Sequence, residues 1–111
     1  MTQARLVRLL GTSPYLAVHA LQEALVARRR QGGPDVVLVL EHTPTITLGR
    51  RKTAIDNVLV ADGVPVVPIE RGGDVTWHAP GQLVAYPIVA LDGPRRDVAR
   101  HLRALEDAVI A

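Results

Sequence analysis

The stretch that decides the fold lies near the middle of the chain and reads Val36-Val37-Leu38-Val39-Leu40-Glu41-His42-Thr43-Pro44-Thr45-Ile46-Thr47-Leu48. Its first five residues are all apolar, which is typical of a central strand with both faces buried. The next four residues predict a turn, and the alternation from Thr45 to Leu48 predicts a second strand, which Gly49 ends. We therefore expect a β-sheet at the centre of the fold.

The segment before this stretch predicts one strand and one helix. Residues 5–9 alternate basic and apolar side chains, as a strand with one polar face does. Ser13 as the N-cap and Pro14 as the first helical residue predict a helix start, and residues 32–34, Gly-Gly-Pro, predict its end. The buried stripe of this helix is expected at Leu16, Ala20, Leu21, Ala24 and Leu25.

The segment after the central stretch predicts short strands. Residues 64–69 contain two prolines and predict an edge strand or a short strand. A strand is also expected from about Val75, followed by a turn at residues 79–81 and another strand at residues 83–89. Residues 54–62 fit a short helical turn and loop and no regular element.

The last element has the clearest helical pattern of the chain. Asp97 can cap it, and apolar residues recur every three or four positions at Val98, Leu102, Leu105 and Val109. Full burial of four such side chains contributes roughly 6–12 kcal/mol. We therefore expect this helix to pack against sequence that the chain does not contain.

Size and composition favour one compact domain of 111 residues with 48% hydrophobic content. No apolar run approaches the roughly 18 residues of a membrane span, and the start lacks a signal-peptide core. We therefore expect a cytoplasmic protein with no membrane partner. The chain has no cysteine, and its four histidines lack metal-ligand spacing, so neither a metal site nor a cofactor is expected.

The charge pattern leaves two interpretations of the surface. The net charge is only +2, but twelve arginines and a single lysine, Lys52, give a pI near 9.7. The arginines cluster at residues 28–30, 50–51 and 95–96, either as an ordinary solvated surface or as a docking face for an acidic partner. Nucleic acid is disfavoured as a partner, because only 3% of residues are aromatic and no binding motif is present.

Residues 71–87 contain the densest group of glycines and polar side chains. The Gly72-Gly73 pair allows positive φ and a close approach of the backbone to a ligand. Polar contacts can come from the side chains of Arg71, Thr76, His78 and Gln82. This combination suits a pocket that holds the polar group of a largely apolar substrate, although a hairpin loop with two turns explains the glycines equally well.

The whole pattern resembles the signature of the octanoyltransferases, also called lipoyl(octanoyl) transferases or lipoate-protein ligase B. That signature has Arg-Gly-Gly, two free positions, Thr, an aromatic residue, His, two free positions, Gly-Gln and then Tyr-Pro. Its fixed positions are all present here, at Arg71, Gly72, Gly73, Thr76, Trp77, His78, Gly81, Gln82, Tyr86 and Pro87. Residues 36–50 are similar to the family's strand, Glu-His-x-Pro turn and second strand. Residues 5–111 resemble the amino-terminal half of such an enzyme.

The resemblance implies an α+β (mixed α/β) fold of the biotin/lipoate protein ligase type, with helices packed on a mixed sheet that is incomplete at the C-terminus. Residues 1–111 would be the amino-terminal portion of a single catalytic domain, with no second domain. The family transfers octanoyl from acyl carrier protein to a lysine of lipoyl domains, in 2-oxoacid dehydrogenase complexes or the glycine cleavage protein. It does so in lipoate biosynthesis, through a cysteine acyl-thioester assisted by a lysine in a Lys-Ile-x-Ser segment.

The catalytic part of that pattern is missing from this chain. There is no cysteine, and Lys52 lies in an Arg-Arg-Lys-Thr segment that does not match. The chain alone is therefore expected to be inactive and to carry no catalytic residue. The resemblance implies acyl-substrate contacts at Arg71, Gly72, Gly73, Asp74, Val75, Thr76, Trp77 and His78, with Gly81 and Gln82 supporting the loop.

Several alternatives remain open at this point. Trp77 could form a wall of the acyl tunnel or belong to the core, and His78 could position the thioester carbonyl or simply stabilise a turn. The chain could also be a non-catalytic acyl-binding or carrier-docking module. An ATP-dependent lipoate or biotin ligase is disfavoured, since neither the Ser-Gly-Gly-Gly nor the Gly-Arg-Gly-Arg segment of those enzymes is present.

Overall fold

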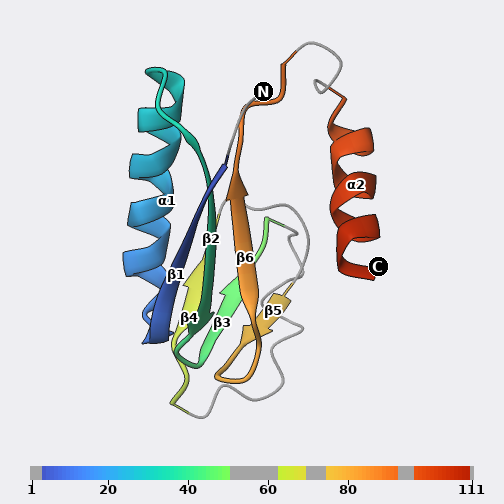
Figure 1. The fold of residues 1–111 in the computed structure, drawn as a ribbon. Helices are drawn as coiled ribbons and strands as arrows, with labels where there is room; N and C mark the ends of the chain where they lie inside the picture. Colours follow the sequence, from blue (N-terminus) through green and yellow to red (C-terminus); the bar gives the residue numbers. More distant parts are fainter. Residues whose placement is uncertain (1–3, 51–62, 70–74, 93–96, 111) are drawn as a thin grey trace.

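A computed structural model of the chain describes residues 4–50, 63–69, 75–92 and 97–110. The fold is mixed α/β, as predicted, and its described strands form two three-stranded sheets, each with parallel and antiparallel neighbours (Figure 1). The segment at residues 54–62, expected to be irregular, lies outside the described residues. Neither helix of the described part combines the length and the apolar content that a membrane span requires.

The first sheet has the order β1-β2-β6 and contains the core. Strand β2 (Asp35–His42) is central, with β1 (Ala4–Ser13) parallel on one side and β6 (Val84–Ile88) antiparallel on the other. On β2 the side chains of Val36, Leu38 and Leu40 are buried, whereas those of Val37 and Val39 are only half-buried. The prediction of a central strand is confirmed, but burial is complete on one face only.

Helix α1 (Tyr15–Arg30) covers that buried face, and its orientation differs from the prediction. Val18 is buried in the core, and Leu21, Leu25 and Val26 pack partly against it. The expected stripe members Leu16, Ala20 and Ala24 are exposed instead. Ala20 and Ala24 have small side chains that bury little apolar area. The helical spacing of apolar residues therefore did not by itself determine which face of α1 packs on the sheet.

The two ends of α1 also differ in how well they were predicted. Ser13 is not the N-cap: it is the last residue of β1, it pairs with His42, and α1 begins without a side-chain cap. The helix ends at Arg30 as predicted. Gly32 has a φ of 92°, and the Gly33 N–H donates to the Arg28 carbonyl over 2.9 Å, which closes the last turn.

The second sheet has the order β4-β3-β5. Strand β3 (Thr45–Leu48) lies between β4 (Val66–Pro68), which runs parallel to it, and β5 (Val75–His78), which runs antiparallel. The predicted strand at 45–48 and the predicted edge strand are both confirmed. Pro68 is tolerated on β4 because an edge strand can leave one side of its backbone unpaired.

Helix α2 (Val98–Ile110) forms where predicted, but it is not among the element pairs of the described chain that pack extensively. The Asp97 carboxylate caps it, accepting the Arg100 N–H over 3.1 Å. None of the α2 residues up to Ile110 is buried, and Figure 1 shows the helix standing apart from the sheets, on the side away from α1. The expectation that α2 packs on sequence outside this chain stays a prediction.

Candidate functional site

Among the described strands the chain crosses between the two sheets twice, and both crossings lie at the same place. The first runs from His42, at the end of β2, to Thr45, at the start of β3. The second runs from His78, at the end of β5, to Val84, at the start of β6. Thr45 pairs with His78 and Leu40 pairs with Val84, so the four strand ends meet. This topology brings His42 and His78 together at the junction of the sheets.

His42 is the centre of this junction, with 0% of its surface exposed. Its Nδ1 lies 3.2 Å from the Ser13 carbonyl oxygen, and its Nε2 lies 2.7 Å from the Tyr86 hydroxyl. A carbonyl can only accept, so Nδ1 carries the hydrogen and donates it to Ser13. In the neutral ring Nε2 is then the acceptor for the Tyr86 hydroxyl.

The environment keeps both members of this pair uncharged. Burial lowers the pKa of His42; the hydrogen bond to the Ser13 carbonyl partly opposes this, and the charge of nearby His78 lowers it further. Burial also raises the pKa of Tyr86 to about 12, with a smaller contribution from Tyr15. His42 and Tyr86 therefore form a neutral hydrogen-bonded pair at physiological pH.

His78 and Tyr15 complete a ring cluster around His42. The ring centroids of His42 and His78 are 5.2 Å apart, and Tyr15 lies 5.0 Å from His42 and 5.7 Å from His78. His78 Nδ1 lies 3.0 Å from Gln82 Oε1, an atom that can only accept. Nδ1 therefore donates, and in the neutral form of the ring the lone pair of His78 is on Nε2.

The turn after β5 holds His78 and Gln82 in this arrangement. The Gln82 side-chain nitrogen donates to the Trp77 carbonyl over 3.2 Å, and the Gln82 N–H donates to the Ala79 carbonyl over 3.1 Å. Gly81 has a φ of 94°, and its N–H donates to Glu41 Oε1 over 2.6 Å. A side chain at residue 81 would be strained at this φ, so glycine suits the turn.

The structure places the other residues expected in the site as follows. Arg71, Gly72, Gly73 and Asp74 lie outside the described residues. Val75, Thr76 and Trp77 belong to β5, where side chains alternate between the two faces. Trp77 therefore points to the face opposite His78, and 49% of its surface is exposed, so it is not a core residue.

Three members of the ring cluster were absent from the set expected in the site: Tyr15, His42 and Tyr86. Two of them stand in quoted motifs, since His42 belongs to the Glu-His-x-Pro segment and Tyr86 to the Tyr-Pro pair. Tyr86 is 44 positions from His42, so the hydrogen bond between them could not be inferred from spacing. Tyr15 carries no local signal beyond being aromatic at the start of a helix.

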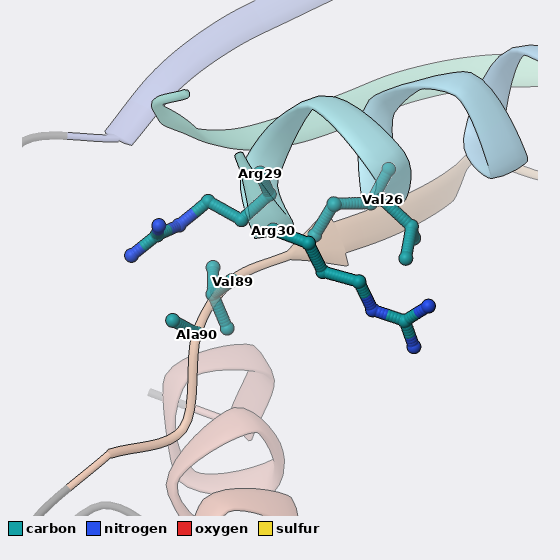
Figure 2. Close-up of a pocket in the computed structure, with 6 residues that line it drawn as sticks. Val26, Arg29, Arg30, Val89 and Ala90 are labelled. Atoms are coloured by element: carbon teal, nitrogen blue, oxygen red, sulfur yellow. The ribbon is translucent and has the colours of Figure 1, made fainter. Parts of the chain in front are cut away.

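A cavity of about 380 Å³ lies at the other end of the first sheet, between the end of α1 and the residues after β6. Figure 2 shows Arg29 and Arg30 beside it, with Val89 and Ala90 on its other side. Arg29 Nε lies 2.5 Å from Oδ1 of Asp35, at the start of β2. His42 ends the same strand, seven residues and roughly 23 Å away at about 3.3 Å per residue. This cavity is therefore separate from the ring cluster.

Protonation of His42 should make the folded state sensitive to acid. Its folded-state pKa lies below the ordinary 6.5, so the unfolded chain binds the proton more readily than the folded chain. Stability is then fully present above about pH 6.5 and is lost as the pH falls through the folded-state pKa. Between about pH 7.5 and 5, the free energy of unfolding measured with urea should fall more steeply with decreasing pH for the wild type than for His42→Gln.

The matched control for this experiment is His101→Gln on α2, which should retain the wild-type dependence on pH. Equal slopes for the wild type and His42→Gln would contradict a buried neutral His42.

The ring cluster can bind and orient a polar group and can accept a proton at His78 Nε2, but it provides no thiol, because the chain has no cysteine. Within the described ranges, no three His, Asp or Glu side chains are grouped so that they could hold a metal ion.

Comparison with known proteins gives one family. The model of the lipoyl protein ligase A/B catalytic domain matches residues 14–111. The octanoyltransferase of Mycolicibacterium smegmatis is 47% identical over 104 residues, covering 94% of this chain and 44% of that protein. The octanoyltransferase of Mycobacterium leprae is 48% identical over 105 residues, which cover 94% of this chain and 44% of that protein. The chain thus spans less than half the length of these curated relatives.

Solved structures agree on the fold. The bi-partite lipoate protein ligase of Thermoplasma acidophilum superposes with a TM-score of 0.66 at 19% identity, covering 99% of this chain and 44% of that chain. A second structure, a putative lipoate protein ligase from T. acidophilum, gives a TM-score of 0.60 at 17% identity, covering 97% of this chain and 45% of the other.

Proposed function

Since the chain belongs to the lipoyl protein ligase A/B catalytic-domain family, we propose that it is the substrate-binding, amino-terminal portion of an octanoyltransferase of lipoate biosynthesis. The observation that carries this proposal is the 47% identity to an octanoyltransferase over 104 residues. In this proposal residues 1–111 belong to a single catalytic domain and include no separate second domain.

The proposed reaction moves octanoyl in two steps. A cysteine thiolate attacks the carbonyl of octanoyl-acyl carrier protein, forming a new thioester as the carrier sulfur leaves. The amine of a lipoyl-domain lysine then attacks, an amide forms, the cysteine sulfur leaves, and the proton of the amine passes to a base. The lack of cysteine in this chain means that the nucleophile must come from outside these 111 residues.

The proposed role of this chain is to bind and orient the octanoyl group. Residues 71–78 contact the acyl substrate, and Gly81 and Gln82 support the loop. His78 is the residue best placed to act on the acyl group, because Gln82 orients its ring and Nε2 keeps a lone pair. That nitrogen can accept a hydrogen bond from the incoming amine or take its proton.

The proposed partners are octanoyl-acyl carrier protein as donor and lipoyl domains as acceptors. The acceptor is supported by the structure from Thermoplasma, whose ligase was studied with its E2 lipoyl domain. No metal or cofactor enters the proposed reaction.

A second candidate function is a non-catalytic acyl-binding or carrier-docking module, which the absence of cysteine favours. One assay separates the two. Octanoyl transfer from acyl carrier protein to a lipoyl domain is measured with this chain alone, and again with the carboxy-terminal portion of the M. smegmatis octanoyltransferase added. We expect no transfer by the chain alone and transfer by the mixture. Octanoyl binding without transfer in both cases would favour the module.

A further inference from the structure

Helix α2 presents a narrow apolar stripe that the rest of the described chain does not cover. Val98, Leu102, Leu105 and Val109 follow one another at intervals of four, three and four residues. At 3.6 residues per turn these four positions fall within an arc of about 60°. Val98 is 60% exposed, Leu102 is 53% exposed and Val109 is 85% exposed, whereas Leu105 is half-buried.

The opposite face of α2 is polar, which makes the helix amphipathic. Arg100, Arg103 and Asp107 lie on that face by the same helical geometry. An apolar row along one side of a capped, regular helix indicates packing against another element, because burial of that row is what normally stabilises such a helix in water.

We propose that this stripe is the interface for the carboxy-terminal portion of the catalytic domain, and this inference rests on the proposed function. The family match runs through α2, so the helix belongs to the domain and is not a linker. The relatives contain more than twice the length that this chain matches. The polypeptide that supplies the cysteine is thus also the one that the domain requires beside α2.

The open edge of β6 supports the same occupant. In the described part of the chain β6 is hydrogen-bonded to β2 on one side only, and Figure 1 shows α2 on the side of its other edge. A further polypeptide can therefore extend the first sheet at β6 and cover the α2 stripe at the same time. Such an arrangement satisfies backbone groups and apolar side chains together.

Two other occupants fit the helix less well. A membrane-surface helix carries a basic polar face with bulky aromatic anchors, whereas α2 balances Arg100 and Arg103 with Glu106 and Asp107 and has no aromatic residue. A second copy of the chain would meet α2 through four aliphatic side chains, which present less than the roughly 800 Å² per partner of a stable interface.

The test uses the whole 111-residue chain, co-expressed with the carboxy-terminal portion of the M. smegmatis octanoyltransferase. We expect the two to purify together and the amides of α2 to exchange hydrogen at least tenfold more slowly in the complex. Leu102→Glu should weaken the complex at least tenfold. The matched control Arg103→Glu, on the opposite face of the same helix, should stay within about twofold of the wild type.

The outcomes separate the alternatives. Equal affinities for Leu102→Glu and Arg103→Glu, or unchanged exchange in α2, would overturn the proposal. Dimers of the chain alone, or sedimentation with phosphatidylglycerol vesicles, would also overturn it if Leu102→Glu abolished them. If the added portion does not fold by itself, a fusion of the two parts replaces the mixture. Failure of α2 to gain protection in that fusion counts equally against the interface.

The same experiment distinguishes the interface from the proposed activity. A complex that depends on Leu102 but transfers no octanoyl would retain the interface and reject the proposed function. Octanoyl transfer that is the same in the wild type and Leu102→Glu would retain the function and reject the interface.

Discussion

Replacing Leu38 with alanine is expected to lower the free energy of unfolding by about 3 kcal/mol. Leu38 is 1% exposed at the centre of β2, where it belongs to the core cluster that α1 covers. Removal of its side chain loses the transfer free energy of the buried atoms and leaves a cavity between sheet and helix. The total free energy of unfolding of a native domain is roughly 5–15 kcal/mol, so the expected loss is a large fraction of its stability.

The measurement for Leu38→Ala is urea unfolding followed by circular dichroism, with Leu10→Ala as the matched control. Leu10 is also on the first sheet, but it is 83% exposed, so its removal should change stability by no more than about 0.5 kcal/mol. Similar losses for the two variants would show that the core does not lie between β2 and α1.

Replacing His78 with alanine is expected to reduce kcat/KM for octanoyl transfer roughly 100-fold in the enzyme completed by the carboxy-terminal portion. The His78 ring is held in place by the hydrogen bond from its Nδ1 to Gln82 Oε1, over 3.0 Å, and by contacts with the rings of His42 and Tyr15. The variant loses the Nε2 lone pair that we propose acts on the incoming amine. A loss mainly in kcat indicates that role, whereas a loss only in KM indicates substrate positioning.

The control for His78→Ala is Arg103→Ala. Arg103 is exposed on the polar face of α2 and belongs to none of the ring contacts around His78. That variant should retain activity within about twofold, because surface substitutions of this kind usually change stability by no more than about 0.5 kcal/mol. Circular dichroism and thermal unfolding of the chain establish that both variants are folded. Equal losses of activity in the two variants would remove His78 from the site.

Most of the elements could be predicted because their signals are local. The apolar run of β2, the glycines after Arg30, the prolines at residues 65 and 68 and the Asp97 cap each act on backbone within a few residues. The errors occurred where a distant partner decided the outcome. Ser13 looked like a helix cap, but pairing of β1 with β2 through His42 makes it a strand residue.

The candidate site was predictable only in part. The motif indicated His78, Gly81 and Gln82 by their residue types, and these three residues lie at the end of β5 and in the turn that follows it. The contribution of His42 became visible only through its contacts with Tyr86 and Ser13, which come from other strands. Their proximity depends on two crossings between sheets, and no spacing along the chain encodes that.

The amino-acid sequence by itself determined the family, the order of strands and helices, and the absence of a thiol nucleophile in these 111 residues. Only the tertiary structure decided which face of α1 is buried, which rings meet at the junction of the two sheets, and that the stripe of α2 stays uncovered by the described chain. The physical reason is that periodicity and capping act within one element, whereas burial depends on the surface that another element presents to it.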